Sequence, residues 1–121
     1  MRLLLAFAAA TEALTGVALM ALPSGVARLL FGAEFVGPGV AAGRVAGVAL
    51  VALGVACGTA RGSRGAGLAM LLYTLPVAGY FAWIGVQGEL VGVLLWPAAA
   101  YHALIGVALG AVMYRARQHA G

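Results

Sequence analysis

The sequence predicts an all-α integral membrane protein: an antiparallel four-helix bundle with a short helix in the outer interface. Hydrophobic residues make up 64% of the 121 residues and charged residues only 8%, whereas soluble domains carry about 25% charged residues. Four apolar stretches also have the length of about 20 residues that a helix needs to cross a hydrocarbon core of roughly 30 Å. We therefore expect residues 1–121 to form a single transmembrane domain.

The first span is expected at residues 3–22, "LLLAFAAATEALTGVALMAL". An arginine precedes this apolar run and small residues occur within it, as in a secretory signal peptide. The run continues to Leu22, however, which is longer than the apolar region of a typical signal peptide. We therefore expect a membrane span.

The next segment, "PSGVARLLFGAEFVGPG", is the one long connection. Ser24 is a plausible N-cap, Val26, Leu29 and Leu30 share one helical face, and Gly32 is a plausible stop. This pattern predicts a short helix lying in the outer interface. The alternative is a lid over the mouth of the bundle.

Three further spans are expected at residues 40–60, 66–86 and 90–113. The connections "ARGSRG" and "QGE" between them are short, so consecutive helices should be antiparallel neighbours. Pro76 and Pro97 interrupt the third and fourth spans, where each favours a kink. Alternatively, Pro97 marks the true start of the fourth helix, and "GELVGVLL" is a shallower lead-in.

Arginine placement predicts the orientation. Arg28 and Arg44 lie toward one side of the predicted bundle. All other arginines lie on the opposite side, namely Arg2, Arg61, Arg64, Arg115 and Arg117. By the positive-inside rule we expect a multi-pass membrane protein with both termini cytoplasmic. Aromatic anchors are expected at the outer boundary, at Phe31, Phe35, Trp83 and Trp96.

Small residues form stripes on two of the spans. The second span carries Gly39, Gly43, Gly47, Gly54 and Gly58 on one face, and the fourth carries Ala99, Ala103, Gly106 and Gly110. Such stripes permit close approach of helix backbones in a membrane. They could join helices of one bundle, or they could join subunits of a homo-oligomer or larger complex through Gly43, Gly47, Gly54, Gly106 and Gly110.

Three ionisable residues lie within the predicted spans: Glu12, Arg44 and His102. A charge at the bilayer centre costs roughly 2.5 to 3.5 kcal/mol, so it usually faces a partner or a cavity. Glu12 lies about 14 Å from the inner boundary and His102 about 20 Å from the inner headgroup level, whereas Arg44 lies about 24 Å up, near the outer boundary. Glu12 and His102 should therefore be at similar depth.

The candidate ligand or proton site consists of Glu12, His102, Arg44, Tyr73, Tyr80 and Tyr101. Arg44 would lie at its outer mouth. A direct ion pair of Glu12 with Arg44 is not implied, because the two side chains lean in opposite directions, and Glu34 is an equally good partner for Arg44. In the structural alternative, Glu12 is protonated and hydrogen-bonded to Thr15 or to tyrosine or histidine neighbours.

Several kinds of chemistry lack support in the sequence. The arginines form no basic run, so nucleic acid is not expected as a partner. A lone buried histidine without a matching second ligand makes a metal site or haem unexpected, and Cys57 has no partner for a disulfide. No nucleophile with a base and no paired carboxylates occur, so we expect no catalytic residues and a protein that is not an enzyme.

The segments "TEALTG", "LPSGVARLLFGAE", "GRVAGVALVALGVAC" and "LLWPAAAYHALIGVAL" together resemble uncharacterised small bacterial four-helix membrane proteins of the DoxX-like type. Proteins of the DoxX family are associated with quinone-linked sulfur oxidation as partners of other subunits. The resemblance therefore implies a redox accessory role without assigning a substrate.

The first span also resembles the first helix of small multidrug-resistance transporters, in "ATEALTGVALMALPSGVARL". That resemblance implies that Glu12 alternates between a proton and a cationic drug. Three functions follow as expectations: a non-enzymatic accessory subunit or lipid- or quinone-binding protein, a proton-coupled small multidrug exporter, and a purely structural assembly partner.

Overall fold

The computed structural model describes all 121 residues and contains five helices and no strands. The helices are α1 (Arg2–Ala21), α2 (Pro23–Phe31), α3 (Pro38–Thr59), α4 (Arg64–Gln87) and α5 (Leu95–His119). All except α2 are long and apolar enough to cross a membrane. The all-α prediction is confirmed, and the four long helices suggest a multi-pass membrane protein.

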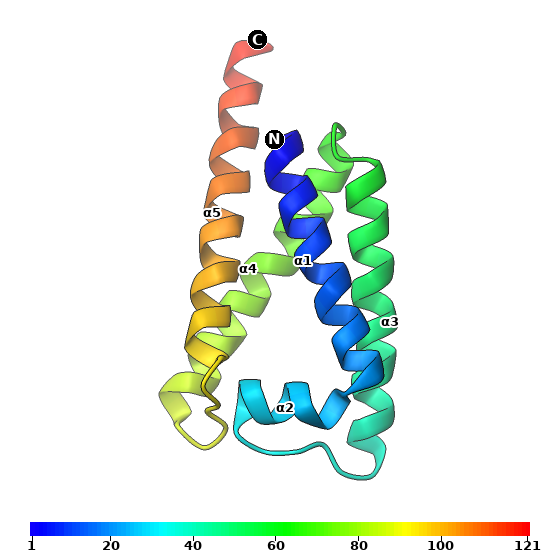
Figure 1. Cartoon of the computed structure of the whole chain (residues 1–121). Helices are drawn as coiled ribbons and strands as arrows, with labels where there is room; N and C mark the ends of the chain where they lie inside the picture. Colours follow the sequence, from blue (N-terminus) through cyan, green and yellow to red (C-terminus); the bar gives the residue numbers. More distant parts are fainter.

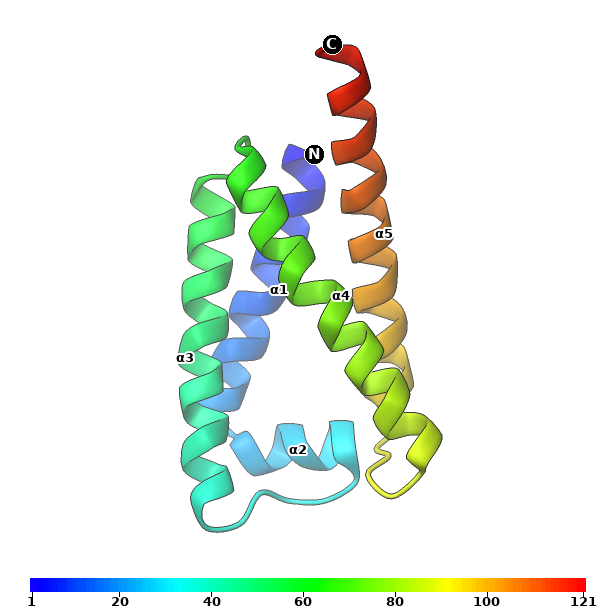
Figure 2. The ribbon, with the colours of Figure 1, turned by 180° about the vertical axis from the view of Figure 1, so that it is seen from behind.

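The four long helices associate as two pairs, α1 with α3 and α4 with α5. The pairs approach each other at the end that holds the N-terminus and the α3–α4 turn, and they diverge toward the opposite end (Figure 1). There α2 lies across the space between them, as the view from behind also shows (Figure 2). We call the first the narrow end and the second the wide end of the molecule.

Helices α1 and α3 are in backbone contact along their shared face. A Cβ atom on Gly47 would lie 2.6 Å from the Gly16 carbonyl oxygen, and one on Gly54 would lie 2.6 Å from the Ala9 carbonyl oxygen. Only glycine leaves room for such an approach. The predicted glycine stripe of α3 therefore joins two helices of the same chain.

Gly106 on α5 similarly packs against Leu75 and Thr74 of α4. The faces that carry Gly43, Gly47, Gly54 and Gly106 are buried within the chain. Gly110 is only half-buried. An oligomer or larger complex stays a prediction, and it could not use the faces of the four buried glycines.

The core of the protein lies toward the narrow end. Leu5, Met70 and Leu109, from α1, α4 and α5, are completely buried there. Cys57 on α3 belongs to the same cluster, and its Sγ lies 3.6 Å from the carbonyl oxygen of Ala66. This cluster joins the two helix pairs.

At the wide end, α2 differs from its prediction at its first residues. It begins at Pro23 with Leu22 as N-cap, so the prediction of Ser24 as N-cap is wrong. The Ser24 hydroxyl instead donates a hydrogen bond to the carbonyl of Phe35, at 3.2 Å. Gly32 ends the helix in the left-handed conformation with φ of 70°, as the sequence predicts.

The fourth long helix begins at Leu95, five residues later than the predicted span. The preceding residues bind the backbone of α2: the Gly92 amide donates to the Leu30 carbonyl and the Leu94 amide to the Leu29 carbonyl, both at 2.9 Å. The alternative of a later helix start is confirmed, although the first helical residue is Leu95, two residues before Pro97. Pro97 then falls in the first turn, where it removes no helical hydrogen bond, so the predicted kink at Pro97 is wrong.

The arginines at the narrow end are Arg2, Arg61, Arg64, Arg115 and Arg117, on the ends of helices or in the turn that meet there (Figure 1). At the wide end Arg28 forms an exposed ion pair with Glu34. The predicted partnership of Glu34 with Arg44 is therefore wrong, because α2 brings Arg28 closer to the following loop.

Candidate functional site

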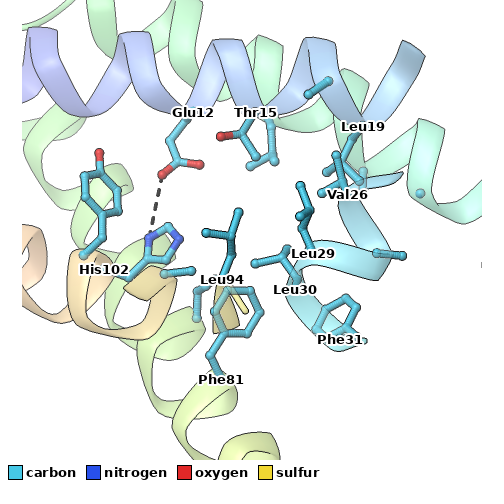
Figure 3. Close-up of a pocket in the computed structure, with 18 of the residues that line it drawn as sticks. Glu12, Thr15, Leu19, Val26, Leu29, Leu30, Phe31, Phe81, Leu94 and His102 are labelled. Carbon is cyan, nitrogen blue, oxygen red and sulfur yellow. Dashed lines mark ion pairs between the residues drawn. The ribbon is translucent and has the colours of Figure 1, made fainter. Parts of the chain in front are cut away.

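A cavity of about 910 Å³ lies between the two helix pairs. It is lined by 25 residues, of which 18 are hydrophobic, and every helix contributes to its wall. A volume between about 300 and 1,000 Å³ is typical of small-molecule sites. Figure 3 shows part of the lining, with side chains of α1, α2, α4 and α5 directed into the same space.

Glu12 and His102 face each other at the edge of this cavity (Figure 3). The distance from His102 Nδ1 to Glu12 Oε1 is 3.7 Å, which is longer than a normal hydrogen bond. Glu12 is 2% exposed and His102 is 7% exposed. The structure thus brings together the two residues that the sequence predicts to be at similar depth.

The positions of both residues follow from helical spacing. On α1, Leu5, Ala8 and Glu12 recur every three or four residues, so they share one face. On α5, Leu109, Ile105 and His102 do the same. Each stripe is apolar where the helices meet at the narrow end and becomes polar where they separate. Glu12 and His102 therefore mark the point at which the core gives way to the cavity.

Three aromatic rings surround the imidazole of His102. Tyr73, Phe81 and Tyr101 each approach it at a steep angle, with ring centroids 5.6, 6.0 and 5.2 Å away. Such edge-to-face geometry is favourable for aromatic rings. The rings hold His102 in place, but Nδ1 of the imidazole has no hydrogen-bond partner.

Two buried polar atoms beside the cavity have no hydrogen-bond partner: the Tyr101 hydroxyl and His102 Nδ1. Leaving a buried polar group unpaired costs about 1 to 3 kcal/mol. Such groups are uncommon in folded proteins, and a bound polar group is one explanation of them. The Tyr101 hydroxyl and His102 Nδ1 could therefore each form a further hydrogen bond.

The remainder of the lining is almost entirely apolar. Val26, Leu29 and Leu30 line it from α2, the same three residues that share one face in the sequence (Figure 3). Phe31 and Phe35, predicted as interfacial anchors, also line the cavity, and Phe31 packs edge-on against Phe81 at 6.0 Å. The inner face of α2 thus covers the wide end of the cavity.

Five of the six predicted site residues line the cavity, namely Glu12, His102, Tyr73, Tyr80 and Tyr101. Arg44 does not: it is exposed on α3, while its neighbours Gly43 and Ala46 line the cavity. No arginine lines the cavity, and the sequence contains no lysine.

Thr15 lines the cavity but does not hydrogen-bond to Glu12. Its hydroxyl donates to the carbonyl of Thr11 at 2.9 Å, one helical turn earlier. The proposed Glu12–Thr15 hydrogen bond is therefore wrong, because the nearer acceptor is the helix backbone.

Sequence reasoning did not find Phe81 as part of the site. The helical spacing could have indicated it, since Tyr73, Val77 and Phe81 recur every four residues and line the cavity from one face of α4. No comparable signal pointed to Leu94, which reaches the cavity from the loop before α5.

The side chains gathered here can exchange protons and form hydrogen bonds, through one carboxyl, one imidazole and the tyrosine hydroxyls. The fold contains no group of three or more histidine, cysteine, aspartate or glutamate residues that could hold a metal ion. No family model matches the chain, and neither a curated protein nor a solved structure matches it.

Proposed function

We propose that this is a non-enzymatic protein of the bacterial inner membrane that binds a hydrophobic molecule, a lipid or a quinone, between its two helix pairs. It would act alone or as an accessory subunit of a larger membrane complex. The observation that carries this proposal is the 910 Å³ apolar cavity with polar groups gathered around Glu12 and His102. An apolar cavity with a few convergent polar groups is the usual form of a ligand site.

In the membrane, the four long helices would form an antiparallel bundle with both termini in the cytoplasm. The arginines at the narrow end support this orientation, because positive charge is concentrated on cytoplasmic segments. The wide end and α2 would then lie at the outer interface. The resemblance to DoxX-like proteins supports the association with a larger redox complex.

Mass spectrometry of the gently purified wild-type protein tests the proposal directly. We expect a copurifying lipid or quinone whose mass is lost in Ala98→Trp, because Ala98 lines the cavity and an indole would fill part of it. Ala100→Trp is the matched control, since Ala100 is exposed on the same helix and does not line the cavity. A folded wild-type protein that carries no bound molecule would contradict the proposal.

The second candidate function is proton-coupled export of a lipophilic cation. It is favoured by Glu12, the one carboxyl among aromatic cavity walls, because a carboxylate and aromatic rings together attract cations. In vesicles, this function requires cation efflux driven by a proton gradient in the wild type and its loss in Glu12→Gln. Glu89→Gln, in the loop before α5, should leave efflux unchanged. Absence of wild-type efflux excludes the exporter.

A further inference from the structure

The charges around the cavity restrict what it can bind. Glu12 is its only acidic residue and no arginine or lysine lines it. A phosphate or carboxylate group buried there would meet no countercharge, and it would face Glu12 at close range. The lining therefore disfavours anionic lipids, including free fatty acids.

The unpartnered polar atoms define what the cavity offers instead. The Tyr101 hydroxyl can donate a hydrogen bond, and so can His102 Nδ1 in the tautomer that carries its hydrogen there. Both atoms are buried and belong to residues that line the cavity, and His102 Nδ1 lies 3.7 Å from Glu12 Oε1, near the middle of α1. A carbonyl oxygen would give both donors an acceptor. An uncharged acceptor therefore suits the Tyr101 and His102 donors, whereas a cation would face both donors and give neither of them an acceptor.

The distribution of apolar side chains fixes the direction in which such a molecule would lie. The polar groups are where the helix pairs separate, whereas the side chains near α2 are apolar: Val26, Leu29, Leu30, Phe31 and Phe35. The polar end of a ligand would thus be deep in the membrane and its apolar body would extend toward α2. A phospholipid has the reverse arrangement, with its head group at the interface.

The surface exposure of the lining shows how a molecule could enter from the bilayer. Ala46 and Ala49 on α3 and Pro76 and Tyr80 on α4 line the cavity and are also exposed. None of the α1 residues in the lining is exposed. Exposed lining residues also occur at the wide end, at Leu29, Leu94 and Pro97, but there α2 and the segment before α5 are joined by backbone hydrogen bonds. Between the long helices, the exposed lining is on the side of α3 and α4, which diverge toward the wide end (Figure 2).

From these observations we infer that the ligand is an uncharged apolar molecule with a hydrogen-bond-accepting end. It enters between α3 and α4, its acceptor is held by Tyr101 and His102, and its apolar body lies against α2. This inference rests on the proposed binding function. It adds the charge of the ligand, the direction in which it is bound and the side from which it enters.

Photolabelling of the full chain in lipid nanodiscs tests the inference with three alkyl probes of equal length that carry a diazirine. One ends in a methyl ketone, one in a carboxylic acid and one in a trimethylammonium group. We expect the ketone to label cavity residues most strongly. A ketone with the diazirine beside the carbonyl should label α5 near His102, and one with the diazirine at the tail should label α2.

Removal of a donor should weaken labelling by the ketone. We expect a loss of about fivefold in apparent affinity for Tyr101→Phe, the equivalent of one hydrogen bond. Tyr114→Phe is the control on the same helix, since Tyr114 is exposed and outside the cavity. His102→Phe is the second variant, for the case in which Tyr101→Phe does not fold.

The outcomes separate this inference from the binding function on which it rests. Preferential labelling by the acid or the ammonium probe, or tail labelling at His102 in place of α2, would overturn the inference and leave a ligand-binding cavity. Labelling of the cavity by none of the three probes would count against both.

Discussion

Helices α1 and α3 pack backbone against backbone, whereas the two helix pairs separate and enclose a cavity. In the α1–α3 contact, glycines from both helices lie against the partner backbone. Between the pairs, large side chains converge only at the narrow end and leave open space beyond Glu12 and His102. Water gives no driving force for helix association inside a bilayer, so packing has to supply it. The comparison indicates that the α1–α3 contact provides stability, which permits the other interface to remain open.

The largest effect is expected from Gly47→Ala. Its Cβ would lie 2.6 Å from the Gly16 carbonyl oxygen and 2.8 Å from Met20, so the helices would have to move apart. We expect the free energy of unfolding to fall by about 3 kcal/mol, measured by unfolding in mixed micelles. Gly79→Ala is the matched control, because a Cβ there meets nothing within 4 Å. Equal changes in unfolding free energy for Gly47→Ala and Gly79→Ala would show that α1 and α3 can move apart without loss of stability.

An intermediate effect is expected from truncating a leucine at the narrow end. Leu109 is completely buried in the core, so Leu109→Ala should leave a void and lower the free energy of unfolding by about 2 kcal/mol. Leu19→Ala should cost less than about 1 kcal/mol, because Leu19 already borders the cavity and loses fewer contacts. The same unfolding measurement compares the two variants. A greater loss of unfolding free energy in Leu19→Ala than in Leu109→Ala would show that Leu19 is tightly packed, and therefore that the cavity is closed under the conditions of the measurement.

The smallest effect is expected from Arg28→Ala at the wide end. The side chains of Arg28 and Glu34 are 68% and 50% exposed, and exposed ion pairs contribute about 0 to 1 kcal/mol. We expect a change in unfolding free energy below about 0.5 kcal/mol. A loss above about 1 kcal/mol would indicate that this pair, rather than the packing of α2, holds the wide end in place.

The sequence was sufficient to predict features that depend on helical spacing. Apolar length predicted the four long helices, and residue counting from the span ends placed Glu12 and His102 at similar depth. Both arguments use only the constant rise of a helix. The same reasoning correctly placed Gly32 at the end of α2.

Features that depend on contacts between distant segments could not be predicted in this way. The start of α5 depends on hydrogen bonds from Gly92 and Leu94 to α2, some sixty residues earlier in the chain. Glycine spacing predicted a close contact, but it could not identify α1 as the partner of α3. The cavity itself depends on the divergence of the two pairs. No local pattern in the sequence encodes that divergence.

Helix α2 lies across the wide end between the two pairs (Figure 1). Only Leu22 separates its first residue from the end of α1, and the carbonyls of Leu29 and Leu30 near its last turn accept hydrogen bonds from the segment before α5. Its nine residues span about 13.5 Å. The length of α2 therefore sets the width of the cavity at the wide end. Removal of one turn of α2 would narrow the cavity without altering Glu12, Tyr101 or His102.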